Sequence, residues 1–194
     1  MITMHTRSER DLMLAGELYH AGDPELAAMR RRARRLCRLY NQTTEDESSS
    51  RTSLLTELFG AIGPGAEIEP PFHCDYGTFI RAGAKLFMNF GCVVLDVNHI
   101  TLGDNVLIGP YVQIVAATHP VDPALRRSGR EYGHPVTIGH NVWIGAGAVI
   151  CPGVTIGDDS VIGAGSVVVK DIPARSVAVG NPCRVIRSVD GPRE

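Results

Sequence analysis

The chain has 194 residues, of which 44% are hydrophobic and 21% are charged, and its formal net charge is -2. These values suit one main globular domain with a small appendage, and they give no global reason to expect binding to nucleic acid or to an anionic membrane. No apolar run reaches the length of a membrane span and the polar start lacks a signal-peptide core, so we expect a cytoplasmic protein. The five scattered cysteines favour reduced thiols over a disulfide framework.

Residues 1–60 are predicted to form a helical cap followed by a linker. Ser8 and Asp11 have the spacing of a capping box, which predicts a short helix that continues to Tyr19. The run Asp23-Pro24-Glu25 combines an N-cap residue, a proline suited to the first helical position and an early acid. A second helix is therefore expected to begin there.

The second helix is expected to be amphipathic, because its apolar residues stand three or four apart at Leu26, Met29, Ala33, Leu36 and Tyr40. Six arginines between positions 30 and 38 occupy most of the remaining surface and are typical of a solvent-exposed helix face. Residues 43–50 are acidic and serine-rich, which indicates a linker, and residues 53–59 are predicted to form one more short helix.

Residues 61–174 are predicted to form a parallel β-helix, because aliphatic residues recur with a step of six. The row comprises Leu102, Ile108 and Ile114, then Ile138, Ile144, Ile150, Ile156, Ile162 and Val168. Neither an amphipathic helix nor an alternating strand gives this period, whereas hexapeptide rungs turn one aliphatic inward per rung. A glycine follows most of these aliphatics, and we expect it at sharp corners whose backbone conformation disfavours other residues.

An earlier row also steps by six, through Ile62, Ile68, Cys74, Ile80, Leu86 and Cys92, but in a different phase. This change of phase predicts one register adjustment between Cys92 and Leu102. Cys74 and Cys92 replace aliphatics in the row, so both thiols are expected to be buried. Residues 175–194 follow the last rung as a C-terminal segment.

The repeat stops between Ile114 and Ile138, where a polar loop near residues 117–135 is expected to leave the coil. Loops on a rigid solenoid commonly carry function, because the coil fixes their ends. His119 lies at the root of this loop and is the best single candidate for a general base, since imidazole titrates close to neutral pH.

Seven segments of the chain form a recognisable set: Gly16-Glu17-Leu18-Tyr19, Cys74-Asp75-Tyr76-Gly77, Asn89-Phe90, residues 100–109, Thr118-His119-Pro120, residues 136–145 and residues 181–186. Together they resemble the hexapeptide-repeat sugar O-acetyltransferases, the family of maltose, galactoside and nodulation-factor acetyltransferases. The resemblance implies a mainly β protein, a left-handed parallel β-helix with a small helical cap and an extruded loop. It also implies a homotrimer with active sites between neighbouring subunits.

The resemblance implies transfer of an acetyl group from acetyl-CoA to a sugar hydroxyl. His119 matches the catalytic histidine of the family and would take the proton of the attacking hydroxyl. Its second ring nitrogen then needs a hydrogen-bonding partner, which the sequence does not identify. Asn89 matches a residue near the reacting centre and could orient the acceptor or contact the oxyanion, although a polar turn residue would also fit this position.

The resemblance places three carboxylates at the acceptor. Asp75 occupies a position that contacts the sugar, and a carboxylate suits two neighbouring hydroxyls. Asp96 lies where galactoside enzymes carry an acidic pair, but here the next residue is Val97. Asp23 belongs to the N-terminal helices that cover the acceptor, and an N-cap role explains it equally well.

The resemblance places the CoA site along the later coils. Backbone groups at Ala146, Ala164 and Val169 would contact the pantetheine arm, and Trp143 would line the groove or pack at the subunit interface. Cations are natural partners for the CoA phosphates. The matching cations are Lys170, Arg184 and Arg187.

Three other functions share this scaffold. A zinc hydratase of the γ-carbonic-anhydrase type needs three converging imidazoles, and His134 and His140 stand one rung apart. The other two are a non-catalytic scaffold and an acetyltransferase for serine or an antibiotic. The acetyltransferase resemblance favours a sugar acceptor, and no metal is expected.

Overall fold

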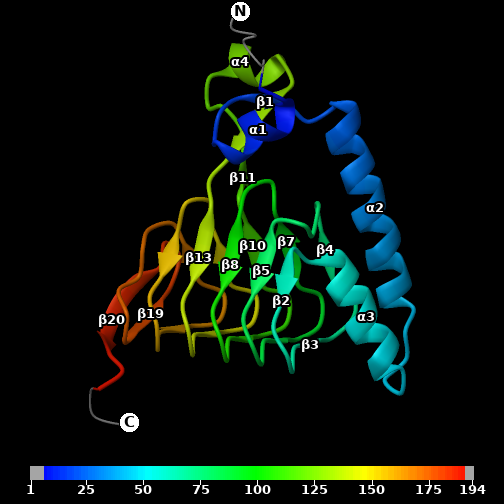
Figure 1. Ribbon diagram of the computed structural model, residues 1–194. Coiled ribbons are helices and arrows are strands. Elements are labelled where there is room, and N and C mark those ends of the chain that lie inside the picture. The colour runs from blue at the N-terminus through cyan, green and yellow to red at the C-terminus, as the bar shows by residue number, and fades with distance from the viewer. Residues whose placement is uncertain (1–6, 191–194) are drawn as a thin grey trace, which may run out of the picture.

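The computed structural model describes residues 7–190, and most of them form a parallel β-helix whose coils pass through three sheets (Figure 1). Sheet 1 contains β2 (Ala61–Ile62), β5 (Ile80–Ala82), β8 (Ile100–Leu102), β13 (Val136–Ile138) and β16 (Thr155–Ile156). Sheet 2 contains β3 (Glu67–Ile68), β6 (Phe87–Met88), β9 (Leu107–Ile108), β14 (Trp143–Ile144), β17 (Val161–Ile162), β19 (Ser176–Val179) and β20 (Arg184–Ser188). Sheet 3 contains β4 (His73–Cys74), β7 (Val93–Leu95), β10 (Gln113–Val115), β15 (Val149–Ile150) and β18 (Val167–Val168).

The six-residue step therefore correctly predicts a parallel β-helix, with one aliphatic of each rung turned into the core. Ile108 and Ile144, for example, lie side by side in sheet 2 and are both buried. Only β20 departs from the parallel arrangement, because it turns back and pairs antiparallel with β19 at the end of sheet 2.

The earlier row of the sequence is wrong beyond Cys74. Ile62 pairs with Ala82 and Cys74 with Val94, so these are the residues at equivalent positions in successive coils. Ile80 instead begins β5, two residues before Ala82, and belongs to a second buried row. The six-residue spacing from Cys74 to Ile80 is thus a coincidence between two rows.

Extra residues accumulate at one edge of the coil. The first two coils are 20 residues long, since Ile62 pairs with Ala82 and Ala82 with Leu102, whereas Ile138 pairs with Ile156, 18 residues further on. Each longer coil gains its two residues between sheets 3 and 1, which we call the 3–1 edge. The predicted adjustment between Cys92 and Leu102 is confirmed there, and a second one lies between Cys74 and Ala82. The polar loop leaves the coil at the same edge.

The glycines after the inward aliphatics have a different role from the expected one. Gly103 and Gly139 do not have positive φ, and the left-handed positions of these turns are taken by Asn105 and Asn141. A Cβ atom on Gly103 would lie 2.7 Å from the backbone nitrogen of His140 in the next coil. Glycine is needed here because successive coils stack backbone on backbone at the edge between sheets 1 and 2.

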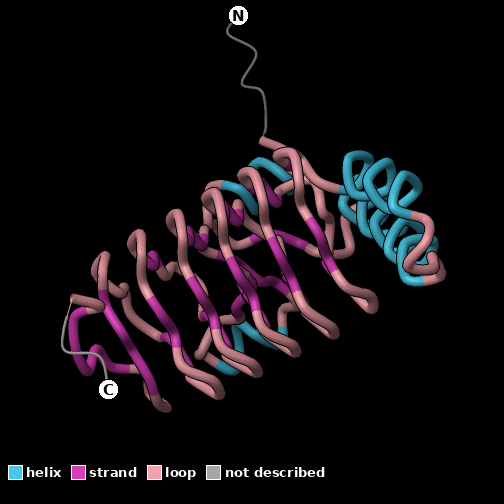
Figure 2. The backbone as a smooth tube through the Cα atoms, turned by 90° about the horizontal axis from the view of Figure 1, so that it is seen from below, coloured by secondary structure: helices cyan, strands magenta, loops and turns pink. Residues whose placement is uncertain are grey.

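Helices α2 (Pro24–Asn41) and α3 (Ser48–Leu58) pack against the first coil (Figures 1 and 2). The predicted N-cap of α2 is confirmed, as the Asp23 carboxylate accepts from the backbone N–H groups of Glu25 and Leu26. Its apolar face is also confirmed, since Leu26 and Leu36 are fully buried. Helix α3 begins earlier than expected, which shortens the linker to residues 43–47.

Helix α1 (Glu9–Leu14) has the predicted capping box between Ser8 and Asp11, but it ends five residues before Tyr19. Gly16 adopts a φ of +73°, which turns the chain out of the helix. Residues 19–20 instead form strand β1, whose partner is distant in the sequence, so local patterning could not reveal it.

The loop at the 3–1 edge is an ordered hairpin (Figure 1). Strand β11 (Ala117–Thr118) pairs antiparallel with β12 (Arg130–Gly133), and the short helix α4 (Pro123–Arg127) lies between them. Strand β1 (Tyr19–His20) adds to the other side of β12, giving the order β1-β12-β11. Among the described helices, none combines the length and apolarity needed to cross a membrane.

We expect Gly103→Ala to destabilise the coil by about 3 kcal/mol, because the new methyl group overpacks against a backbone that cannot retreat. Gly22→Ala is the matched control, since a Cβ on Gly22 has no neighbour within 4 Å. Thermal or urea unfolding checks both variants. Equal stability of Gly103→Ala and wild type would contradict backbone stacking.

Candidate active site

His119 leaves the end of β11 on the hairpin, where 59% of its side chain is exposed. Its Nε2 atom lies 3.7 Å from Oε2 of Glu131, a residue of β12. The hairpin creates this proximity, because the neighbours Thr118 and Tyr132 pair across it. Glu131 is therefore the acidic partner for the imidazole that sequence patterning did not find.

Glu131 is held from its other side. The hydroxyl of Tyr19 donates a 2.6 Å hydrogen bond to Oε1 of Glu131, and Tyr19 is fully buried. The signal for this contact in the sequence was weak, because it depends on pairing between strands more than 100 residues apart. Only the three-stranded arrangement of β1, β12 and β11 brings these side chains together.

Asp75 follows β4 at the 3–1 edge and is half-buried. Burial raises the pKa of its carboxyl, the Glu131 carboxylate raises it further, and Arg30 and Arg34 on α2 oppose both effects. Asp75 and Glu131 are thus close enough to interact electrostatically. Glu131 thus interacts with both His119 and Asp75, and the cations Arg30 and Arg34 of α2 act on the same Asp75 carboxyl.

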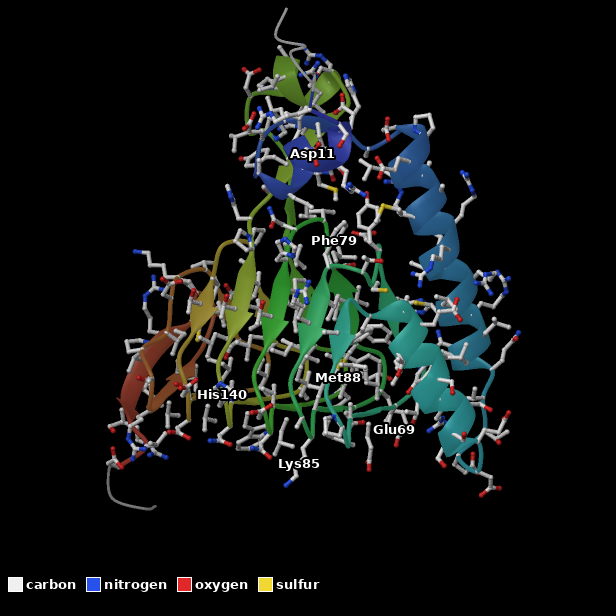
Figure 3. All side chains as sticks on the ribbon, viewed as in Figure 1. Asp11, Glu69, Phe79, Lys85, Met88 and His140 are labelled. Carbon is white, nitrogen blue, oxygen red and sulfur yellow. The ribbon has the colours of Figure 1, made fainter. Side chains whose placement is uncertain are left out.

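Asp96 cannot be the direct acceptor contact that the resemblance implies, because its side chain is fully buried. Its two oxygens accept from the backbone N–H groups of Asp75 at 3.1 Å, Tyr76 at 2.9 Å and Phe79 at 3.2 Å. Asp96 therefore shapes the turn that presents Asp75. Val97 is buried as well. Phe79 marks this edge in Figure 3, below the hairpin and α1.

Arg30 joins the cap helix to the same turn. Its guanidinium donates a 2.7 Å hydrogen bond to the hydroxyl of Tyr76, lies over the Tyr76 ring and also bonds the carbonyl of Ala21. Asp23, the third expected acceptor carboxylate, is engaged by the first turn of α2. Helix capping is thus the role that the structure gives Asp23.

A cleft lies at the edge between sheets 2 and 3. It has a volume of about 540 Å³ and is lined by Asn89 and by apolar residues that include Trp143, Ala146 and Ala164. Trp143 points outward with 54% of its area exposed. Asn89 has a turn role too, since its Oδ1 atom accepts from the N–H of Phe90 at 2.7 Å.

One chain does not bring all the expected site residues together. Asn89 and His119 lie at opposite edges of sheet 3, because Asn89 precedes β7 whereas His119 follows β11 on the hairpin that leaves the far end of β10. Val169 and Lys170 follow β18 at the 3–1 edge, away from Ala146 and Ala164. Arg184 and Arg187 lie on β20 at the end of sheet 2.

The two histidines of the zinc hypothesis do not converge. His134 precedes β13 and lies near Gly16, whereas His140 follows β13 at the opposite edge of sheet 1, the lower edge in Figure 3. His140 instead accepts a 3.0 Å hydrogen bond from the backbone N–H of Asp104. Across residues 7–190, no three histidine, cysteine or acidic side chains gather as a metal-binding set.

Comparison with known proteins finds two family models along the chain. Residues 12–63 match the maltose acetyltransferase hexapeptide capping motif, and residues 135–170 match the bacterial transferase hexapeptide of six repeats. Nodulation protein L from Rhizobium meliloti is 53% identical over 180 residues, which cover 93% of this chain and 98% of that protein.

Two solved structures are similar over nearly the whole chain. A maltose O-acetyltransferase from Clostridium difficile superimposes with a TM-score of 0.94 at 51% identity, covering 96% of this chain and 100% of that one. A hexapeptide-repeat acetyltransferase from Vibrio cholerae, complexed with acetyl-coenzyme A, has a TM-score of 0.89 at 40% identity, covering 95% and 100%. The similarity thus includes the cap, the coil and the hairpin.

We expect Asp96 to make stability depend on pH. Burial raises the pKa of Asp96 to about 7, despite its backbone hydrogen bonds. Between about pH 4, the ordinary carboxyl pKa, and about pH 7, the folded chain retains a proton that the unfolded chain has lost. The contribution of Asp96 is therefore complete at low pH and falls by about 1.4 kcal/mol per unit as pH rises through this window.

Asp96→Asn cannot titrate, so the stability of wild type relative to this variant should fall from about pH 4 to about pH 7 and then level off. Denaturant unfolding of both proteins over this range measures the difference. A difference independent of pH would show that Asp96 is ionised in the fold throughout.

Proposed function

The chain belongs to the hexapeptide-repeat sugar O-acetyltransferases, and we propose from this membership that it transfers the acetyl group of acetyl-CoA to a sugar hydroxyl with His119 as general base. The chain is thus an acetyltransferase. One of the similar acetyltransferases has been solved in complex with acetyl-coenzyme A. The observation that carries the proposal for His119 is its place beside Glu131, a carboxylate that also interacts with Asp75.

The reaction begins with proton removal. A neutral imidazole of His119 takes the proton of the acceptor hydroxyl as the hydroxyl oxygen attacks the thioester carbonyl carbon. The carbon–sulfur bond then breaks, and the CoA sulfur leaves with the proton that His119 returns. Glu131, 3.7 Å from Nε2, stabilises the positive charge that the imidazole carries between these two steps.

The acceptor side of the site is supported by Asp75. Its half-buried carboxylate can accept hydrogen bonds from two adjacent hydroxyls, a pattern that sugars offer. Asp96 holds the backbone of that turn in place from behind. A serine or antibiotic acceptor is the alternative, and serine differs from a sugar in offering a single hydroxyl to Asp75.

The cleft of Asn89, Trp143, Ala146 and Ala164 suits the pantetheine arm of acetyl-CoA, because its lining is apolar and its small residues allow close approach to the backbone. Lys170, Arg184 and Arg187 are the cations we assign to the CoA phosphates. The amide of Asn89 is placed in this cleft, where it can donate to the oxyanion that develops on the thioester oxygen.

We propose a homotrimer whose sites form between copies. His119 and the Asn89 cleft occupy different edges of one chain, so a second copy must bring its cleft to the hairpin edge of the first. The outward face of sheet 2 supports an interface, because Phe87, Leu107, Trp143 and Val161 align across neighbouring strands. Leu107 and Trp143 are about half exposed in the single chain.

All five cysteines are free thiols, which suits the cytoplasmic location that we propose.

We expect His119→Ala to lower kcat by roughly 100- to 10 000-fold, the usual contribution of a general base, with the KM for acetyl-CoA changed less than twofold. His140→Ala is the matched control, because His140 lies at the opposite edge of sheet 1. CoA release is measured for wild type and for both variants with a panel of mono- and disaccharides and with serine. The compounds that support release by the wild type identify the acceptor class. Turnover like wild type in His119→Ala would remove this residue from the mechanism.

A further inference from the structure

The N-terminal arm, residues 7–20 with α1 and β1, reaches the hairpin through one buried aromatic side chain, Tyr19. Strand β1 pairs antiparallel with β12, which places Tyr19 opposite Glu131 and His20 opposite Arg130. The Tyr19 ring has no exposed surface, so its hydroxyl has no access to water and depends on a protein partner. That partner is Oε1 of Glu131, at 2.6 Å.

The bond divides the two oxygens of Glu131 between two tasks. Oε1 accepts from Tyr19, while Oε2 lies toward Nε2 of His119. Burial and the neighbouring carboxylate raise the pKa of the Tyr19 phenol, so it remains protonated and acts only as a donor. A distance of 2.6 Å is typical of a hydroxyl bonded to an ionised carboxylate. The hydroxyl therefore sets the rotation of the Glu131 carboxylate.

The arm itself is anchored to the coil, so Tyr19 is a fixed support. The buried amide of Asn98, at the 3–1 edge, donates to the carbonyls of Met13 and Leu14 at the end of α1 and to the carbonyl of Gly133 at the end of β12, at 3.2–3.3 Å. One side chain of the coil thereby joins the arm to the hairpin. A further hydrogen bond, 3.2 Å from Arg130 Nε to His20 Nε2, ties β1 to β12.

We infer that Tyr19 is a positioning residue for acetyl transfer, whose hydroxyl holds Glu131 in the orientation that aligns His119. The inference rests on the proposed roles of His119 and Glu131. Under this inference the arm contributes to catalysis through the Tyr19 hydroxyl. If the arm only covered the acceptor, packing of the Tyr19 ring would be enough and the hydroxyl would not be needed.

The test is a double-mutant cycle between positions 19 and 131. Tyr19→Phe keeps the ring and should lower kcat roughly tenfold, the effect of losing a hydrogen bond to a charged group, with the KM for acetyl-CoA unchanged. In a Glu131→Ala background the same substitution should change kcat by less than about twofold, because the hydroxyl then has no carboxylate to hold. A purely structural role of Tyr19 would give the same loss in both backgrounds.

Tyr40→Phe is the matched control. Tyr40 is also buried, and its hydroxyl bonds the backbone carbonyl of Ile68, far from the hairpin. This variant should lose stability and keep kcat. If Tyr19→Phe is insoluble, replacement of Tyr19 by trifluorotyrosine retains the ring and strengthens the donor, and kcat should then change while stability holds.

Wild-type kcat in Tyr19→Phe or in the trifluorotyrosine protein, or equal losses in both backgrounds of the cycle, would overturn the inference. Failure of the proposed function is distinguishable from these outcomes, since it would appear as wild-type turnover in His119→Ala.

Discussion

Close stacking of backbone on backbone determines where this chain can accommodate extra residues. A glycine follows the inward residue in each of the five strands of sheet 1, at positions 63, 83, 103, 139 and 157, and a Cβ there would lie within 2.8 Å of the next coil. Two turns at the edge between sheets 2 and 3 are as tight, since Gly109 and Gly145 lie against Ala146 and Ala164. Extra residues cannot enter such turns without separating the coils. The 3–1 edge does not have this restriction on extra residues. Both the two-residue extensions of the longer coils and the hairpin lie there.

The division between edges explains the organisation of the site. The residues that we assign to the acceptor and to proton transfer lie where the chain can lengthen: the turn of Asp75 and the hairpin of His119 and Glu131. The cleft we assign to acetyl-CoA lies where the coils stack tightly, and it is built from small side chains. Because one chain presents these two halves on different edges, the proposed chemistry depends on contact between copies. The N-terminal arm adds the Tyr19 contact to the acceptor half.

The sequence predicted the features that repeat or that act locally. The step of six predicted the coil, and the caps at Ser8 and Asp23 predicted two helix starts. Contacts between distant segments escaped it. The Tyr19–Glu131 bond requires β1 to find β12, and the burial of Asp96 requires the turn at Asp75 to fold over it. Ile80 was assigned to the wrong row, because two buried rows are offset by two residues in β5 and both contain aliphatic side chains.

We propose that each site combines His119 of one copy with Asn89 of another, and mixed oligomers of two inactive variants test this arrangement. His119→Ala and Asn89→Ala chains, each of low activity alone, are co-expressed or refolded together. Random mixing in a cyclic trimer should restore about a quarter of the wild-type activity per chain, since one pairing in four joins an intact His119 to an intact Asn89. Mixing His119→Ala with the double variant should restore none. A first mixture no more active than its two components would contradict the shared site.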